Sequence, residues 1–228
     1  MPALSTLDAD HVASEKSTEG AAAILDAATQ LFADKGFDSV PLSAIAERAG
    51  VSKGNIFYHF GSKELLYTAV IRQACDRTAR LLHEVTTRTG SFAERVRHFA
   101  TAHLRNLMSD PTLSRLILRE LMEGDARRGS TQVEKIMGAN FEKLVDIFRM
   151  GQKQGVVKQD LDPAVLALAL VAGNVFFFQV RSMLPHFPDA RSIDNADYYS
   201  KVVAEVFLNG VLAESLPLAD ELSHARAD

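Results

Sequence analysis

The chain has 228 residues, 47% of them hydrophobic, and a formal net charge of −4 at pH 7. This composition allows a sizeable core in one large or two small domains and excludes gross disorder. The single cysteine, Cys75, excludes an internal disulfide and suits a reducing cytoplasm. Residues 1–18, 19–64 and 65–228 carry net charges of −2, −2 and 0, so no basic block attracts nucleic acid at long range.

The first predicted element follows an unpatterned start. Residues 1–18 are polar and small, without the basic and apolar regions of a signal peptide, and we expect a disordered arm. In residues 21–37 the apolar positions recur at the spacing of one helix face, and Gly36 ends this helix. These positions are Ile24, Ala28, Leu31 and Phe32.

Two short helices come next. Residues 41–50 place Leu42, Ile45, Ala46 and Ala49 on one face, with Pro41 at the start and Gly50 at the end. Ser52 is a good N-cap for the following helix, and Val51 with Ile56 forms a hydrophobic staple. Two short helices joined by a tight turn with a glycine are typical of a helix-turn-helix.

The rest of the chain keeps a helical pattern. We predict helices over 63–88, 91–108, 112–124, 130–154, 162–184 and 196–215, and we find no period-two strand pattern. The predicted fold class is all-α, with about nine helices. A three-helix head with the helix-turn-helix occupies 19–64, a ligand-binding and dimerisation bundle 65–217, and a polar tail 218–228.

The third helix has two unlike faces. At 100° per residue Ile56 and Phe60 point into the head, whereas Gly54, Asn55, Phe57 and Tyr58 point away, with Lys53 and His59 at the boundary. An amide, rings and a glycine that lets a backbone approach suit the major groove of DNA. Lys63 and the helix start capped by Ser62 offer a charge and free N–H groups to a phosphate.

The stretch ILDAATQLFADKGFDSVPLSAIAERAGVSKGNIFYHFGSKELLYTAV resembles the DNA-binding head of the TetR family of bacterial transcriptional regulators. The resemblance implies a cytoplasmic homodimer that binds a palindromic double-stranded DNA operator. A small-molecule effector in the C-terminal domain would change the separation of the two heads and release the DNA. The DNA-contacting set that the resemblance implies is Lys53, Gly54, Asn55, Phe57, Tyr58, His59 and Lys63.

From the chemistry of contacts in the major groove, we assign Gly54, Asn55 and Phe57 to bases, and Tyr58, His59 and Lys63 to phosphates. Many relatives have basic residues just before the first helix, and this chain has none there. We therefore expect its DNA binding to depend less steeply on salt than that of a basic relative.

The longest apolar run, residues 163–180, is slightly short for a membrane span and contains Asn174 and Gln179, so we interpret it as a buried helix. It and the apolar stripe in residues 196–215 could form a four-helix dimer seam. Asn174 is either a satisfied buried amide, a dimer contact or a polar anchor for a mostly apolar effector. The predicted pocket residues are His103, Leu107, Phe141, Phe148, Asn174 and Phe178.

Two other functions stay open at this stage. One is an all-α carrier or enzyme for a hydrophobic small molecule with a vestigial head, and the other is a membrane-associated helical protein. We find neither a nucleophile–base pair nor a metal-ligand set with usable spacing, so we expect no enzymatic activity, no metal and no cofactor.

Overall fold

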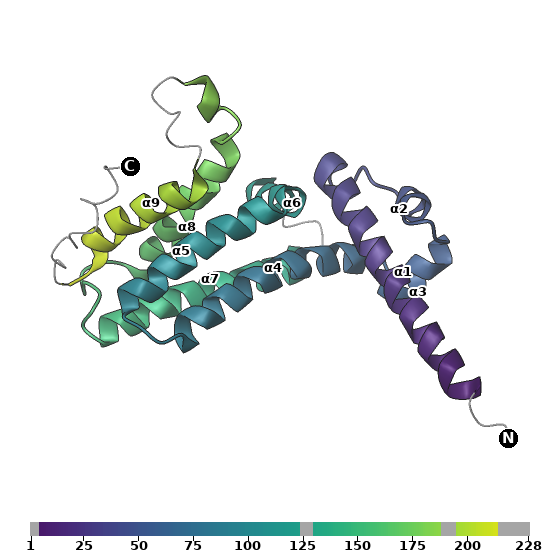
Figure 1. The fold of residues 1–228 in the computed structure, drawn as a ribbon. Helices are drawn as coiled ribbons and strands as arrows, with labels where there is room; N and C mark the ends of the chain where they lie inside the picture. Colours follow the sequence, from purple (N-terminus) through teal and green to yellow (C-terminus); the bar gives the residue numbers. More distant parts are fainter. Residues whose placement is uncertain (1–4, 124–129, 188–194, 214–228) are drawn as a thin grey trace, which may run out of the picture. The chain divides into compact units, whose positions relative to one another are not determined.

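The computed structural model describes residues 5–123, 130–187 and 195–213, and these form nine α-helices and one 3₁₀ helix (Figure 1). The all-α prediction is therefore confirmed for the described part of the chain, where the one β feature is an isolated bridge between Val157 and Leu212. The elements are α1 Ser5–Lys35, α2 Leu42–Ala49, α3 Lys53–Phe60, α4 Lys63–Thr87, α5 Phe92–Ser109, α6 Pro111–Glu123, α7 Ser130–Lys153, α8 Pro163–Val180, η1 Leu184–His186 and α9 Ala196–Val211.

The chain divides into two compact units. The first comprises Met1–Asp76 and Asp110–Met137, and the second comprises Arg77–Ser109 and Gly138–Asp228. The sequence places the end of the head at residue 64, whereas in the structure α6 packs on α1 within the first unit. The packing of α6 depends on contacts distant in sequence, which a reading of local periodicity does not detect.

The core of the first unit forms where the helical periodicity predicts it. Ile24, Ala28, Leu31 and Phe32 of α1 are buried, and they pack with Ile45 of α2 and Ile56 of α3. Since α2 and α3 have only eight residues each, this burial stabilises them far more than helix propensity does. The same core includes residues from α4, α6 and α7: Leu66, Val70, Ile71, Leu113, Leu116 and Val133.

The first helix is longer than predicted. The structure continues α1 back to Ser5, so residues 5–18 are helical rather than a disordered arm, and residues 1–4 of that arm lie outside the described residues. This segment has no regular apolar face, which is why periodicity missed it. Its leucine, alanine, glutamate and lysine residues nevertheless have high helix propensity, and the helix they extend is anchored by a buried face.

The second unit packs α5 against α8 and α9, around a core that includes Val96, Phe99, Phe148 and Leu208. Two ion pairs, Arg97–Glu205 and Arg105–Asp197, lie along the α5–α9 contact. The segment after α7 also fixes the end of α9 through backbone hydrogen bonds. The Lys158 N–H donates to the Val211 carbonyl (3.0 Å), and the Ala213 N–H donates to the Val156 carbonyl (3.2 Å).

Helix α8, which the sequence predicts to be buried and to contribute to a dimer seam, is buried on one side in the single chain. Leu166, Leu170, Asn174, Phe177 and Phe178 are buried, but a stripe on another side is exposed in the single chain. The helix is long and apolar enough to cross a membrane by length and composition alone, and 33% of it is buried. Its exposed apolar members are Val165, Leu168 and Phe176.

Candidate nucleic-acid interface

The turn before α3 fixes where this helix begins. Gly50 has φ 67°, a left-handed conformation that glycine adopts without strain, and its N–H bonds to the carbonyls of Ala46 and Glu47. The chain then enters α3 through Ser52, whose hydroxyl accepts a hydrogen bond from the Asn55 N–H at 3.2 Å. Both the predicted glycine turn and the predicted serine cap are present.

Helix α3 has one buried and one exposed face. Ile56 is 0% exposed, whereas Phe57 is 52% and Tyr58 80% exposed. Lys53, Gly54 and Asn55 are also exposed. Solvation alone does not account for two large rings on the surface of an eight-residue helix, since burying a ring is strongly favourable. This face therefore has the character of a surface that another molecule covers.

The fold does not require glycine at position 54. A methyl group there would meet the Ser52 hydroxyl oxygen at 3.5 Å, an ordinary van der Waals contact, and the backbone is normally helical. Glycine in a helix costs roughly 0.5–1 kcal/mol relative to alanine. Its presence on the exposed face is thus consistent with the close approach of an external ligand.

His59 and Lys63 are less exposed than the rest of the predicted set. The His59 ring packs edge-on against Tyr58, and its Nε2 atom is 3.6 Å from where a Cβ on Gly20 of α1 would lie. The Lys63 ammonium lies 4.4 Å from the centre of the Phe37 ring and 3.5 Å from the Asp38 carbonyl oxygen. Both side chains therefore also pack against the rest of the head.

The start of α4 is capped as predicted, because the Ser62 hydroxyl accepts a hydrogen bond from the Leu65 N–H at 3.1 Å. Leu65 is not among the predicted contact residues, although it is exposed; it lies 3.4 Å from where a Cβ on Gly61 would be. In the pair Leu65–Leu66 periodicity assigns only Leu66 to the core. That contrast was the available signal that Leu65 faces outward.

In the second unit the structure brings together two of the predicted pocket residues. The Asn174 amide donates to the Ala100 carbonyl oxygen (2.7 Å) and lies 3.3 Å from His103 Nδ1. The His103 ring stacks on Phe99 with a centroid separation of 5.5 Å. Burial lowers the pKa of His103 to about 4, so the imidazole is neutral at pH 7. With Nδ1 accepting from Asn174, the proton is on Nε2.

The other four predicted pocket residues lie in different surroundings. Phe148 is buried against Phe92 and Phe207, and the buried Phe178 ring has the Arg181 guanidinium 4.0 Å from its centre. Leu107 is half-buried and Phe141 is exposed. Their role in ligand binding stays a prediction.

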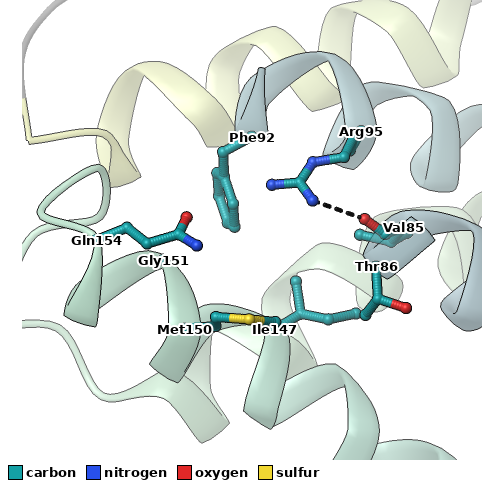
Figure 2. A pocket seen from close by; sticks show the side chains of 8 residues that line it. All are labelled: Val85, Thr86, Phe92, Arg95, Ile147, Met150, Gly151 and Gln154. Carbon is teal, nitrogen blue, oxygen red and sulfur yellow. Dashed lines mark hydrogen bonds between the residues drawn. The ribbon is translucent and has the colours of Figure 1, made fainter. Parts of the chain in front are cut away.

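A small hollow lies between α4, α5 and α7, at residues that the prediction does not include (Figure 2). Arg95 donates to the Val85 carbonyl at 3.2 Å, and Figure 2 shows the Phe92 ring between the guanidinium and the Gln154 side chain. Arg95 Nε is buried without a hydrogen-bond partner among the described atoms. The volume, about 10 Å³, admits one water molecule. One of three arginines on an amphipathic helix gave no sequence signal for this arrangement.

Among the residues that the structure describes, no group of three histidine, cysteine or acidic side chains could hold a metal ion.

A capped short helix that turns an amide and two rings outward behind a glycine turn defines a helix-turn-helix DNA-binding head. The family model of bacterial regulatory proteins of the tetR family matches residues 24–70, and the model of the tetracyclin repressor-like C-terminal domain matches residues 93–204. The chain therefore belongs to the TetR family of bacterial transcriptional regulators.

Curated relatives agree with this assignment. The chain is 38% identical over 102 residues to the HTH-type transcriptional regulator RutR of Escherichia coli (strain K12), covering 45% of this chain and 48% of RutR. It is 46% identical over 65 residues to the HTH-type transcriptional repressor Rv3405c of Mycobacterium tuberculosis (strain ATCC 25618 / H37Rv), covering 28% and 35%. The chain thus spans about half the length of RutR and about a third of Rv3405c.

Solved structures share the fold. NalD of Pseudomonas aeruginosa, the secondary repressor of the MexAB-OprM multidrug efflux pump, superposes with a TM-score of 0.66 at 19% identity, covering 88% of this chain and 99% of NalD. The fatty acid degradation regulator FadR of Bacillus halodurans gives a TM-score of 0.66 at 20% identity, covering 83% and 95%.

Proposed function

We propose that this protein is a homodimeric repressor that binds a palindromic operator through α3 and releases it when a small, mostly apolar effector binds the C-terminal domain. The observation that carries this proposal is the outward face of α3, which presents Asn55, Phe57 and Tyr58 around a glycine that the fold does not need.

The chemistry of this face supports the assigned contacts. The Asn55 amide can donate and accept at a base edge, the Phe57 ring can contact a thymine methyl, and Gly54 lets the backbone approach. Tyr58 supplies a hydroxyl, and His59 and Lys63 supply donors for phosphate oxygens. In this assignment Lys63 leaves or shares its site over Phe37 when DNA binds.

The exposed stripe on α8 supports the homodimer. It has a counterpart on α9, where Val206 is 70% exposed and Tyr198 and Val202 are also exposed. A second subunit explains these residues better than a membrane does, because α8 also carries the buried Asn174, and α9 carries the charged side chains of Lys201 and Glu205. We therefore assign the protein to the cytoplasm, without membrane insertion.

The effector-binding part of the proposal concerns the interior of the second unit. His103 and Asn174 form a neutral polar pair among apolar side chains, which suits a mostly apolar ligand with one or two polar groups. We assign no catalytic role to this pair, since neither residue faces a nucleophile or a metal-ligand set among the described residues.

The experiment is fluorescence anisotropy with labelled promoter-proximal DNA of the protein's own gene. We expect Tyr58→Ala and Lys63→Ala to weaken binding about tenfold each, the loss of one good contact. Gly54→Ala should weaken binding while leaving the melting temperature unchanged or higher, because the head has room for the methyl group.

The glycine and lysine variants each have a matched control. Gly138→Ala adds a methyl group to α7 with nothing within 4 Å, and Lys135→Ala removes an exposed lysine from the same helix. Both controls should bind DNA like the unmodified protein. Unchanged binding in Gly54→Ala and Tyr58→Ala together would refute the assigned face. Absence of operator-specific binding even at low salt would favour a carrier with a vestigial head.

A further inference from the structure

The Phe37 ring lies under the ammonium group of Lys63, which is one of the residues proposed to contact a phosphate. The Lys63 Nζ atom is 4.4 Å from the centre of the ring and 3.5 Å from the Asp38 carbonyl oxygen. An ammonium group has three N–H donors, so a ring face and one carbonyl oxygen leave donors free for a phosphate. Lys63 also lies in the first turn of α4, where the helix dipole disfavours a cation. The stability of the helix therefore does not explain the lysine.

The Phe37 ring is itself held from behind by two buried rings. Its centre is 4.9 Å from that of Tyr67 and 5.8 Å from that of Phe32, and both neighbours belong to the core of the first unit. The Tyr67 hydroxyl donates to the Glu120 carboxylate of α6 at 2.5 Å. Phe37 remains half-buried, so its ring can support a charge at the surface while the core fixes its position.

Helix α6 contacts the support of this ring at a second point. The Arg119 guanidinium lies 3.7 Å from where a Cβ on Gly36 would be, in the turn directly before Phe37. Two successive residues of α6 thus reach the surroundings of Phe37, Arg119 at the preceding turn and Glu120 through Tyr67. The place of the ring is therefore set by side chains distant in sequence.

Resting on the proposed function, we propose that Phe37 is a positioning residue for DNA binding, which holds the Lys63 ammonium where it meets a phosphate. Tyr67 and Glu120 hold the ring in turn. A lysine side chain loses much rotamer freedom when it makes a fixed contact, and a side chain that is already held loses less on binding. Lys63 therefore shares its ring contact with the phosphate and does not leave it.

The test is a double-mutant cycle on the full chain, measured by fluorescence anisotropy with labelled promoter-proximal DNA of its own gene. We expect Phe37→Leu to weaken binding about threefold, the effect of one exposed cation–π contact. Phe37→Tyr keeps a ring under the ammonium and should bind like the unmodified protein. In a Lys63→Ala background, Phe37→Leu should have no further effect, whereas general damage to the head would weaken binding in both backgrounds.

A second variant leaves the apolar core intact. Tyr67→Phe keeps the ring and removes only the hydroxyl that binds Glu120, so it should weaken binding about twofold when Lys63 is present and not in Lys63→Ala. Phe187→Leu changes an exposed phenylalanine of the second unit and should leave the affinity unaltered. All affinities are measured well below the melting temperature of each variant, so that unfolding does not mimic a loss of binding.

The outcomes separate this proposal from the function on which it rests. Tighter binding by Phe37→Leu would mean that the ring withholds Lys63 from DNA, and it would overturn the proposal. Unchanged affinity in Phe37→Leu, or an equal loss with and without Lys63, would overturn it as well. An unchanged affinity in Tyr67→Phe overturns the role given to Glu120. If Lys63→Ala alone has no effect, the phosphate contact of the proposed function fails, and the positioning role fails with it.

Discussion

The Tyr67 hydroxyl of α4 donates a 2.5 Å hydrogen bond to the Glu120 carboxylate of α6. Tyr67 is buried, and its ring packs edge-on against Phe32 of α1 (5.1 Å) and at a tilt against Phe37 (4.9 Å). Phe37 in turn lies below the Lys63 ammonium. A carboxylate on α6 is thus connected through two aromatic rings to a lysine at the start of α4, all within the first unit.

This hydrogen bond should contribute measurably to stability. We expect Tyr67→Phe to lower the free energy of unfolding by about 1.5–3 kcal/mol, because a charged acceptor loses its donor in a partly buried place. Urea unfolding measures the effect, and combination with Glu120→Gln in a double-mutant cycle isolates the coupling. Tyr58→Phe removes a solvent-exposed hydroxyl and should change nothing; a loss in Tyr67→Phe no larger than in this control would contradict the expectation.

The exposed apolar stripes on α8 and α9 predict a dimer that single charges disrupt. Phe176→Glu or Val206→Glu should convert the protein to monomer, since a buried unpaired carboxylate at the interface costs several kcal/mol. Sedimentation equilibrium gives the mass directly. Met122→Glu changes an equally exposed residue on α6 and should leave the mass unaltered. Dimers persisting in both α8 and α9 variants would place the interface elsewhere.

Acid should destabilise the protein through His103. The pKa of this buried imidazole is lowered to about 4 from its ordinary 6.5. Between these two pH values the unfolded chain binds a proton at His103 that the folded protein does not bind. Its stabilising contribution is full above pH 6.5 and declines as the pH falls towards 4. Near pH 4 the free energy of unfolding is lower by about 3 kcal/mol than at neutral pH through this group.

Urea unfolding between pH 7.5 and 5 tests this dependence, and His103→Gln should flatten it while keeping an acceptor for Asn174. Carboxylates respond in a more acidic window. The hydrogen bond from Arg105, for example, lowers the pKa of Asp197, whose contribution is lost only as the pH falls past its ordinary value of 3.8. A slope that is equally steep in His103→Gln would assign the dependence to other groups.

The turn glycine Gly50 should be sensitive to substitution where the helical glycine Gly138 is not. Gly50→Ala must hold an alanine at φ 67°, which costs about 1–2 kcal/mol, although nothing lies within 4 Å of the added methyl group. Gly138→Ala, in the middle of α7 with similar free space, should gain about 0.5–1 kcal/mol. The melting temperatures of the two variants should therefore shift in opposite directions from that of the unmodified protein. Shifts of the same sign would refute this explanation.

Most helices could be predicted because their apolar positions repeat with the helical period and their ends carry caps. Asp162, which stands before Pro163 at the start of α8, accepts a hydrogen bond from the Ala164 N–H at 2.7 Å. The start of α1 could not be predicted, since residues 5–18 lack an apolar face and become helical as a continuation of a packed helix. For α8 the sequence predicts both a buried helix and part of a dimer seam, because composition does not distinguish burial within a chain from burial by a partner.

The outward face of α3 followed from the sequence because one rotation per 3.6 residues fixes which side chains oppose Ile56. The effector site is harder to predict from the sequence, since it depends on which side chains of different helices come into contact. His103 and Asn174 meet, as polar residues in apolar helices often do, but Phe141 lies at the surface and the hollow beside Arg95 involves none of the six predicted residues. Such meetings are set by helix packing, which local periodicity does not encode.

The backbone hydrogen bonds between residues 156–158 and residues 211–213 have a consequence for which amino-acid substitutions the family can accumulate there. These hydrogen bonds join main-chain atoms, so substitutions that keep an apolar side chain at the buried positions Val157, Val211 and Leu212 leave them in place. Proline is the exception, since it lacks the N–H that Lys158 and Ala213 each supply. Homologues that keep this geometry should retain apolar residues at positions 157, 211 and 212 and avoid proline at positions 158 and 213.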